Sequence, residues 1–225
     1  MPRIARAVAA GFPHHVIQRG NNREKVFFDK KDREKYLFFL KKYSERWKSP
    51  VLAYCLMSNH VHILAKPGKE ESLYKMMQGV TLCYTQYANK KHQRSGRLWE
   101  NRYHSCIVDK DRYLWAVARY IEQNPVRAKI VEKAEDYPYS SAKAHLQGIK
   151  DEVLGEELFE ESQRKDYTRL IHAKPKEDEI NEIRYYTRTG RPLGEQKFVN
   201  LMERKLRRQF SLKPRGRPRK IEKDN

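Results

Sequence analysis

Hydrophobic residues along the first 125 positions follow two spacings, one helical and one extended. Helical spacing, with apolar side chains returning every three or four positions, runs over residues 31–47, 72–90 and 111–124. Dense runs of apolar, often β-branched residues predict strands at 14–20, 51–57 and 60–65, and another within 98–108. Asp29 and Asp111 stand where two of the helices would be capped. Pro125 is expected to end the third helix, because the residue before a proline avoids the α region.

The order of these elements is strand, helix, strand, strand, helix, strand, which is the split βαβ pattern of ferredoxin-like folds. We therefore expect an α+β fold with a mostly antiparallel sheet, helices on one face, and ligand or nucleic acid on the open face. Beyond about residue 150 the composition changes, and helices at 178–186 and 195–210 would form a small helical hairpin. The hairpin is either a helix-turn-helix or a packing element. The chain thus divides into a domain at 1–148, a helical C-terminal extension at 149–210 and a basic tail at 211–225.

The net charge of the chain indicates which kind of macromolecule it binds. Lys and Arg number 48 against 29 Asp and Glu, a formal net charge of +19. Such a field attracts polyanions, so we expect nucleic acid rather than a membrane surface. The chain has no apolar run of about 18 residues and no convincing secretory signal at its start. Three widely spaced cysteines fit reduced thiols, so a cytosolic protein is expected.

Candidate chemistry begins with two histidines on one predicted strand. Side chains alternate along a strand, so His60 and His62 point the same way while Val61 and Ile63 point into the core. Two imidazoles on one face can bind a single divalent cation. Taken alone, the pair is more simply explained as two polar residues on the open face of a half-buried strand.

The predicted helix ending near Asn124 presents a second set of polar groups. At about 100° per residue, Tyr113, Tyr120 and Asn124 fall within about 40° of one another. Tyr120 and Asn124 are one turn apart, close enough to act on one ion or one phosphate. The alternative is that both tyrosines are half-buried packing residues with wet hydroxyls.

Several motifs, in order, resemble one family. His60-Val61-His62 is similar to the HUH signature of single-strand DNA endonucleases, and residues 120–128 (YIEQNPVRA) resemble the Tyr-x-x-x-Asn-Pro-Val-Arg-Ala segment of REP-associated tyrosine transposases. Segments at 18–23, 96–103, 139–141 and 190–194 also resemble motifs of that family. The resemblance covers most of the chain.

The resemblance implies a ferredoxin-like fold and a metal-dependent transposase, in the bacterial cytoplasm and associated with the nucleoid. It implies that His60, His62 and Asn124 are metal ligands for Mg²⁺ or Mn²⁺, and that Tyr120 is the nucleophile. The ligand set would also suit zinc. Tyr113 is the second candidate nucleophile on helical geometry, although it lies outside the matching motif.

Basic and aromatic residues near these motifs are the candidate DNA contacts. Arginines can bind phosphates and an aromatic ring can stack on a base, whereas the alternative is a solvated rim around a core tryptophan. The tail resembles an AT-hook, which reads a narrow minor groove, but a basic arm that binds any phosphate backbone is the preferred interpretation. The candidates are Arg19, Asn22, Arg23, Arg97, Trp99, Arg102, Arg127, Arg215 and Arg217.

The predicted function is a metal-dependent single-stranded DNA endonuclease and strand-transferase that cuts at hairpin-forming repeats through a 5′-phosphotyrosine. The alternative is a non-catalytic single-stranded nucleic-acid-binding protein derived from a transposase. A hydrolytic metallo-phosphodiesterase is a weaker rival, since no acidic residue is close in sequence to the histidine pair. We expect single-stranded DNA with a hairpin, such as a REP-like repeat, as partner, no organic cofactor, and a monomer or homodimer.

Overall fold

The computed structural model of this chain describes residues 6–110 and 112–210. Its strands are β1 (His14–Arg19), β2 (Val51–Leu56), β3 (His60–Ala65) and β4 (His104–Ile107). Its α-helices are α1 (Lys30–Arg46), α2 (Ser72–Lys91), α3 (Leu114–Glu122), α4 (Asn124–Arg127), α5 (Ala142–Gln147), α6 (Arg164–His172), α7 (Glu177–Thr189) and α8 (Gln196–Leu206). Short 3₁₀ turns lie at Asn21–Arg23, Ala134–Asp136 and Glu161–Gln163.

The four strands form one antiparallel sheet in the order β2-β3-β1-β4. This is the arrangement that two interleaved βαβ units produce, so the expected ferredoxin-like α+β fold is confirmed. β3 is an interior strand, with His62 opposite Ile17 of β1 on one side and Cys55 of β2 on the other. Its position is therefore fixed by hydrogen bonds along both edges.

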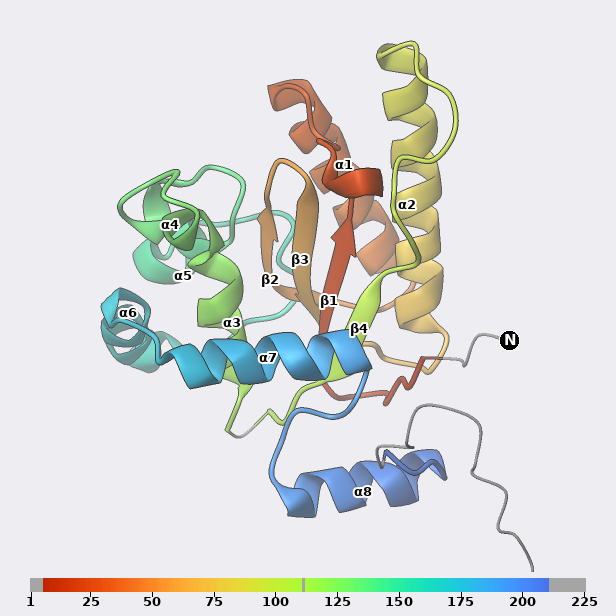
Figure 1. The fold of residues 1–225 in the computed structure, drawn as a ribbon. Coiled ribbons are helices and arrows are strands. Elements are labelled where there is room, and N and C mark those ends of the chain that lie inside the picture. Colours follow the sequence, from red (N-terminus) through yellow and green to blue (C-terminus); the bar gives the residue numbers. More distant parts are fainter. Residues whose placement is uncertain (1–5, 111, 211–225) are drawn as a thin grey trace, which may run out of the picture.

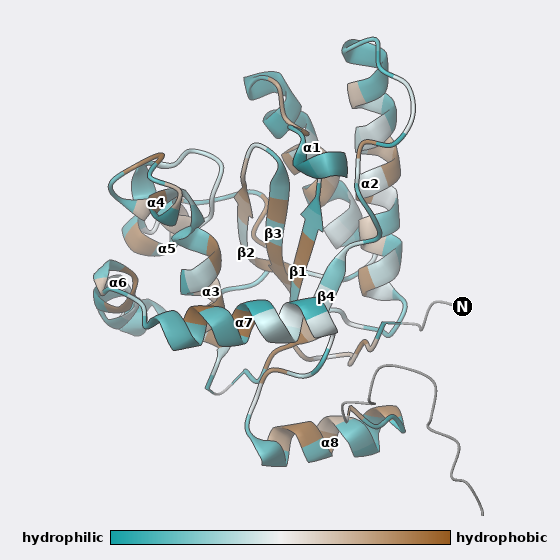
Figure 2. Cartoon of the chain, viewed as in Figure 1, coloured by the Kyte–Doolittle hydropathy of each residue, from teal (hydrophilic) through white to brown (hydrophobic). Residues whose placement is uncertain are grey.

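Helices α1 and α2 cover one face of the sheet (Figure 1). Figure 2 shows hydrophobic residues along the strands and hydrophilic ones over the far ends of these two helices. The core on this face contains Val61 and Ile63 from β3 together with Tyr36, Leu40, Leu73, Met76 and Val80 from the helices. Asp29 caps α1 as predicted, since its side chain accepts a hydrogen bond from the Asp32 amide.

The second face of the sheet is also covered, contrary to the expectation of an open face. Helix α3 packs against β2 and β3, and α7 lies across β1 and β4 (Figure 1). Val117 and Ile121 of α3 and Ile180 and Ile183 of α7 are buried in one cluster there. The sequence concealed this because α7 is mostly polar and contributes its apolar residues from one narrow stripe.

The helical segment before Pro125 also differs from expectation. Helix α3 ends at Glu122, and a separate turn, α4, resumes at Asn124 with Pro125 in its first turn. Proline suits a first turn because its missing amide hydrogen has no partner there. The break lies at Gln123, two residues before the proline. Position 111, expected to cap this helix, lies outside the described residues.

The C-terminal extension does not form the expected helical hairpin. Helix α8 packs through Phe198 and Met202 against Ala9 and Ile107, in a small cluster of its own. Helix α6, which was not predicted, buries Tyr167 and Ile171 in the core shared with α3. The extension is therefore built onto the sheet domain at several points. No helix in residues 6–110 or 112–210 has the length and hydropathy to cross a bilayer.

A buried carboxylate ties α3 to the following helices. Glu122 is fully buried and accepts hydrogen bonds from Ser141 Oγ at 2.5 Å, His145 Nδ1 at 2.6 Å and Tyr167 Oη at 2.8 Å. All three groups donate to it; Ser141 Oγ also lies 3.3 Å from the Tyr54 carbonyl, whereas His145 Nδ1 and Tyr167 Oη depend on the carboxylate.

Glu122→Ala is expected to lower the free energy of unfolding by about 3 kcal/mol, because it leaves the buried His145 Nδ1 and Tyr167 Oη without an acceptor. Urea denaturation monitored by circular dichroism measures the change. Exposed Glu132→Ala is the control, with an expected change within about 0.5 kcal/mol. Equal effects of the two substitutions would show that the network does not hold α3 in place.

Candidate active site

A cavity of about 550 Å³ opens between the sheet and helices α3, α4 and α7. It brings together six residues named from the sequence: Arg19, His60, His62, Tyr120, Asn124 and Arg127. It is also lined by residues that sequence reasoning missed, among them His15, Glu100, His104, Arg184, Thr187 and Arg188.

The two histidines of β3 face this cavity side by side. Their ring centroids are 5.0 Å apart. His60 Nδ1 lies 2.7 Å from Asn59 Oδ1, and His62 Nδ1 lies 3.0 Å from His15 Nε2. Within the described part of the chain, neither Nε2 atom has a hydrogen-bond partner. Each ring therefore uses Nδ1 for the protein and keeps Nε2 for the cavity.

Burial keeps these imidazoles neutral. It is the main cause that lowers the pKa of His60 to about 4, with the charges of Arg19 and Arg127 adding to it. Burial, followed by the neighbouring His60 and His15, also holds the pKa of His62 well below its usual 6.5. A neutral imidazole has a free lone pair, which is the state that a metal ion requires.

Tyr120 lies against this pair. Its ring meets the ring of His62 edge-on at 5.5 Å and that of His15 at 5.6 Å. The Arg127 guanidinium lies over the tyrosine ring, 4.4 Å from its centroid, and donates to the Tyr120 carbonyl at 2.7 Å. These contacts hold the ring in place with 7 % of its surface exposed.

Asn124 adds an oxygen to the same cavity. Its amide nitrogen donates to the carbonyls of Tyr120 and Ile121 at 3.0 and 3.1 Å. Because both neighbours are acceptors, the amide must present nitrogen to them and keep Oδ1 as a free acceptor. By contrast, Tyr113 lines a different cavity, where its hydroxyl lies 3.5 Å from Glu182 Oε1.

Four arginines make the cavity attractive to anions. Arg19 comes from β1, Arg127 from α4, and Arg184 and Arg188 from α7. Arg127 Nη1 is buried without a hydrogen-bond partner among the described residues. A buried guanidinium with an unused donor is suited to a phosphate or carboxylate oxygen.

The remaining predicted contacts lie elsewhere. Asn22, Arg23 and Arg97 are exposed, the first two in a turn with positive φ. Trp99 is 6 % exposed and packs near Tyr36 and Tyr84, so its ring is covered by the core rather than offered to a base. Arg215 and Arg217 lie outside the described residues.

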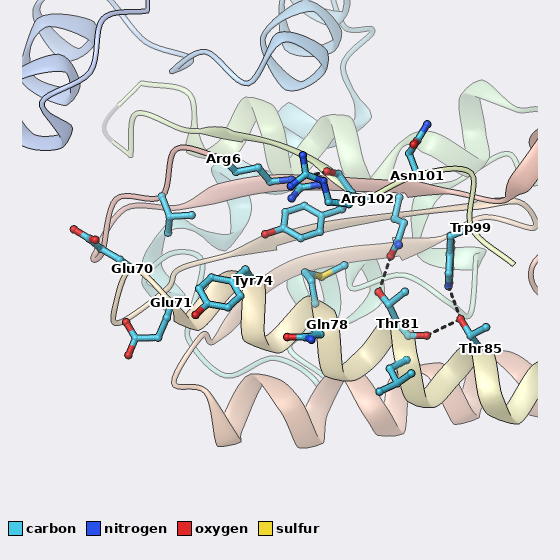
Figure 3. A pocket seen from close by; sticks show the side chains of 15 residues that line it. Arg6, Glu70, Glu71, Tyr74, Gln78, Thr81, Thr85, Trp99, Asn101 and Arg102 are labelled. Atoms are coloured by element: carbon cyan, nitrogen blue, oxygen red, sulfur yellow. Dashed lines mark hydrogen bonds between the residues drawn. The ribbon is translucent and has the colours of Figure 1, made fainter. Parts of the chain in front are cut away.

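A second, larger cavity of about 910 Å³ lies on the opposite side of the sheet, along α2 (Figure 3). Exposed Arg102 lines it together with Tyr74 and Trp99. Two hydrogen bonds shape its wall: Trp99 Nε1 donates to Thr85 Oγ1 at 3.1 Å, and Thr81 Oγ1 to Gln18 Oε1 at 3.1 Å. The walls of this cavity are mostly apolar, and neither His60 nor His62 lines it.

The donor set of the first cavity fits a divalent cation. Two neutral imidazoles and an amide line it: imidazole nitrogen suits zinc and other late transition metals, and an amide oxygen suits Mg²⁺ or Mn²⁺. Asp29, Asp32 and His92 also lie within ligand distance of one another. There, however, the Lys91 ammonium already bridges the two carboxylates at 2.6 and 2.7 Å, so that group is an ion-pair cluster at the start of α1.

The structure thus has a paired-histidine cavity beside Tyr120 of α3 on a ferredoxin-like sheet. The family profile described as "Transposase IS200 like" matches residues 10–124, about half of the chain. The chain therefore belongs to the IS200-like transposase family. The matched region ends at Asn124, so α6, α7 and α8 lie outside it.

Two relatives agree with this family. The chain is 25 % identical over 109 residues to a protein of Haemophilus influenzae named as a REP-associated tyrosine transposase, covering 43 % of this chain and 61 % of that relative. The fold is similar to that of a REP-associated tyrosine transposase solved with a REP hairpin. That similarity has a TM-score of 0.52 at 15 % identity and covers 72 % of this chain and 96 % of the other. The resemblance inferred from the motifs is confirmed.

Arg188→Ala is expected to weaken binding of a single-stranded oligonucleotide several-fold and to reduce the slope of log affinity against log salt by about 1, because it removes one phosphate-binding charge. Arg46→Ala, which removes an exposed arginine from α1 on the other face of the sheet, is the matched control. Fluorescence anisotropy at several salt concentrations measures both. Equal losses of affinity in the two variants would mean that oligonucleotide binding depends only on the net charge of the protein.

Proposed function

We propose that this chain is a metal-dependent endonuclease and strand-transferase acting on single-stranded DNA at hairpin-forming repeats. One observation carries the proposal: His60, His62, Asn124 and Tyr120 line a single cavity, although they come from β3, α3 and α4. Family membership supports DNA processing as the general activity.

In this proposal His60, His62 and Asn124 hold the cation, through two Nε2 atoms and Oδ1. A bound Mg²⁺ or Mn²⁺ would polarise the scissile phosphate and stabilise charge on its oxygens. Arg127, with its unused Nη1, binds a phosphate oxygen beside Tyr120. Arg19, Arg184 and Arg188 guide the backbone of the strand into the cavity.

Tyr120 is the proposed nucleophile. A phenol is a weak nucleophile at neutral pH, so it needs a phosphate that is held in line and partly neutralised. The Tyr120 Oη–P bond forms while the P–O3′ bond breaks; the phenol proton is lost to solvent, and the departing 3′ oxygen takes up a proton from solvent. The product is a 5′-phosphotyrosine, and a 3′-OH can reverse the step without ATP because the phosphodiester energy is kept.

The DNA is proposed to be a single strand carrying a hairpin. The similar fold solved with a REP hairpin and the relative named for REP association both support this choice. We propose that Asn22, Arg23, Arg97 and Arg102, which are exposed, contact the backbone away from the cavity. We further propose residues 1–148 as the catalytic unit and 149–210 as an extension completing it, with the tail at 211–225 as a basic arm.

The test is a denaturing gel of full-length protein with Mg²⁺ or Mn²⁺ and end-labelled hairpin oligonucleotides from the genome that encodes it. Wild type is expected to give a covalent protein–DNA band that disappears with EDTA and in His60→Ala. Tyr120→Phe should abolish the band, and Tyr113→Phe, the matched control on the same segment, should retain it.

Two outcomes would contradict the proposal. Cleavage that persists in Tyr120→Phe would assign the chemistry to water or to another tyrosine. Tight, hairpin-dependent binding without cleavage of any oligonucleotide would instead favour the non-catalytic binding protein.

A further inference from the structure

A chain of hydrogen bonds runs from the C-terminal extension to the histidine pair. Thr187, on α7, is 3 % exposed, and its Oγ1 lies 2.8 Å from His15 Nδ1. His15 Nε2 in turn lies 3.0 Å from His62 Nδ1. The rings of His15 and His62 are stacked, with an interplanar angle of 12°. The positions joined by the two contacts are 172 and 47 apart in the sequence.

The direction of these hydrogen bonds follows from the proton of one hydroxyl. Thr187 Oγ1 lies 2.8 Å from the Ile183 carbonyl, which can only accept, so we assign its single proton to that contact. Toward His15 Nδ1, and toward Cys106 Sγ at 3.4 Å, the hydroxyl oxygen then accepts. His15 Nδ1 must then carry a proton. His15 is 1 % exposed, and burial disfavours a charged ring, so the imidazole is neutral. Its Nε2 is then a lone pair and accepts from His62 Nδ1–H.

This order of hydrogen bonds determines which nitrogen of His62 carries its proton. With its proton on Nδ1, His62 directs the Nε2 lone pair toward the cavity. Were Thr187 to donate to His15 instead, the order would reverse, and His62 would carry its proton on Nε2, where it blocks a metal. The carbonyl of Ile183 therefore selects the tautomer that can bind a cation.

His60 is oriented by an independent arrangement of the same kind. Asn59 Nδ2 donates to the Arg23 carbonyl at 2.8 Å, which directs Asn59 Oδ1 toward His60 Nδ1 at 2.7 Å. Both histidines thus have their Nδ1 proton fixed by a protein acceptor. Partners of this kind, one shell beyond the ligands, commonly contribute 10- to 100-fold to metal affinity.

We propose that Thr187 and His15 are positioning residues that fix the metal-binding tautomer of His62, so that the C-terminal extension completes a site whose ligands all lie in the family domain. This inference rests on the proposed function for the metal itself, but the tautomer can be observed without metal.

The first measurement is a long-range ¹H–¹⁵N correlation spectrum of the histidine rings in metal-free, full-length protein, with His15 and His62 assigned by single substitutions. Both are expected to carry their proton on Nδ1. A proton on Nε2 of His62 would overturn the inference, whatever the protein does to DNA. This measurement needs no variant at Thr187, so it stands even if such a variant folds poorly.

The second measurement is Mn²⁺ affinity, read from the free-ion signal in electron paramagnetic resonance. Thr187→Val, which keeps the shape and removes the hydroxyl, is expected to weaken binding about 10-fold or more and to move the His62 proton toward Nε2. Thr187→Ser should restore both. Thr189→Val is the matched control, because it removes a hydroxyl of the same helix that also donates to a backbone carbonyl, at Tyr185, but is exposed.

The outcomes separate the inference from the proposed function. Wild-type affinity in folded Thr187→Val would overturn the inference while leaving the metal site intact. Equal losses in Thr187→Val and Thr189→Val would overturn it too, because they would point to the helix as a whole. Absence of Mn²⁺ binding in wild type would overturn the inference together with the proposed metal chemistry.

Discussion

The alternation of side chains along β3 is the constraint on which the rest of the structure depends. As an interior strand, β3 cannot shift without breaking hydrogen bonds to both β1 and β2. Val61 and Ile63 belong to the core beneath α1 and α2, so His60 and His62 must point to the other face. A one-residue slip would turn the two imidazoles under α1 and α2 and turn Val61 and Ile63 toward the cavity. The hydrophobic core beneath α1 and α2 therefore fixes which face of the sheet carries the two histidines.

The second face has to be partly covered, because the two imidazoles are neutral only when buried and need a cavity in which to bind a cation. Helix α3 brings Tyr120 over the sheet, the break at Gln123 turns Asn124 and Arg127 toward the same cavity, and α7 closes it from the opposite side. Burial lowers the pKa of both histidines, which favours the neutral ligand form, and the arginines supply positive charge at the rim. The extension is therefore part of the cavity wall.

Local patterns were sufficient to predict the strands, the two long helices and the topology, because each element buries one continuous stripe. The histidine pair was visible for the same reason, since its spacing of two is a property of one strand. His15 and Thr187 could not be predicted, because their roles depend on contacts between distant positions. The sign of such a role that the sequence did offer was His15 itself, a polar residue directly before Val16 in β1. The covered second face was missed because α7 is largely polar in sequence.

The most direct test of the account is an anomalous difference map from crystals of the full-length protein soaked in Mn²⁺. The account predicts one strong peak in the cavity of about 550 Å³, within bonding distance of His60 Nε2, His62 Nε2 and Asn124 Oδ1, on the Tyr120 side of β3. A peak at Asp29, Asp32 and His92 instead, with none beside the histidine pair, would contradict it.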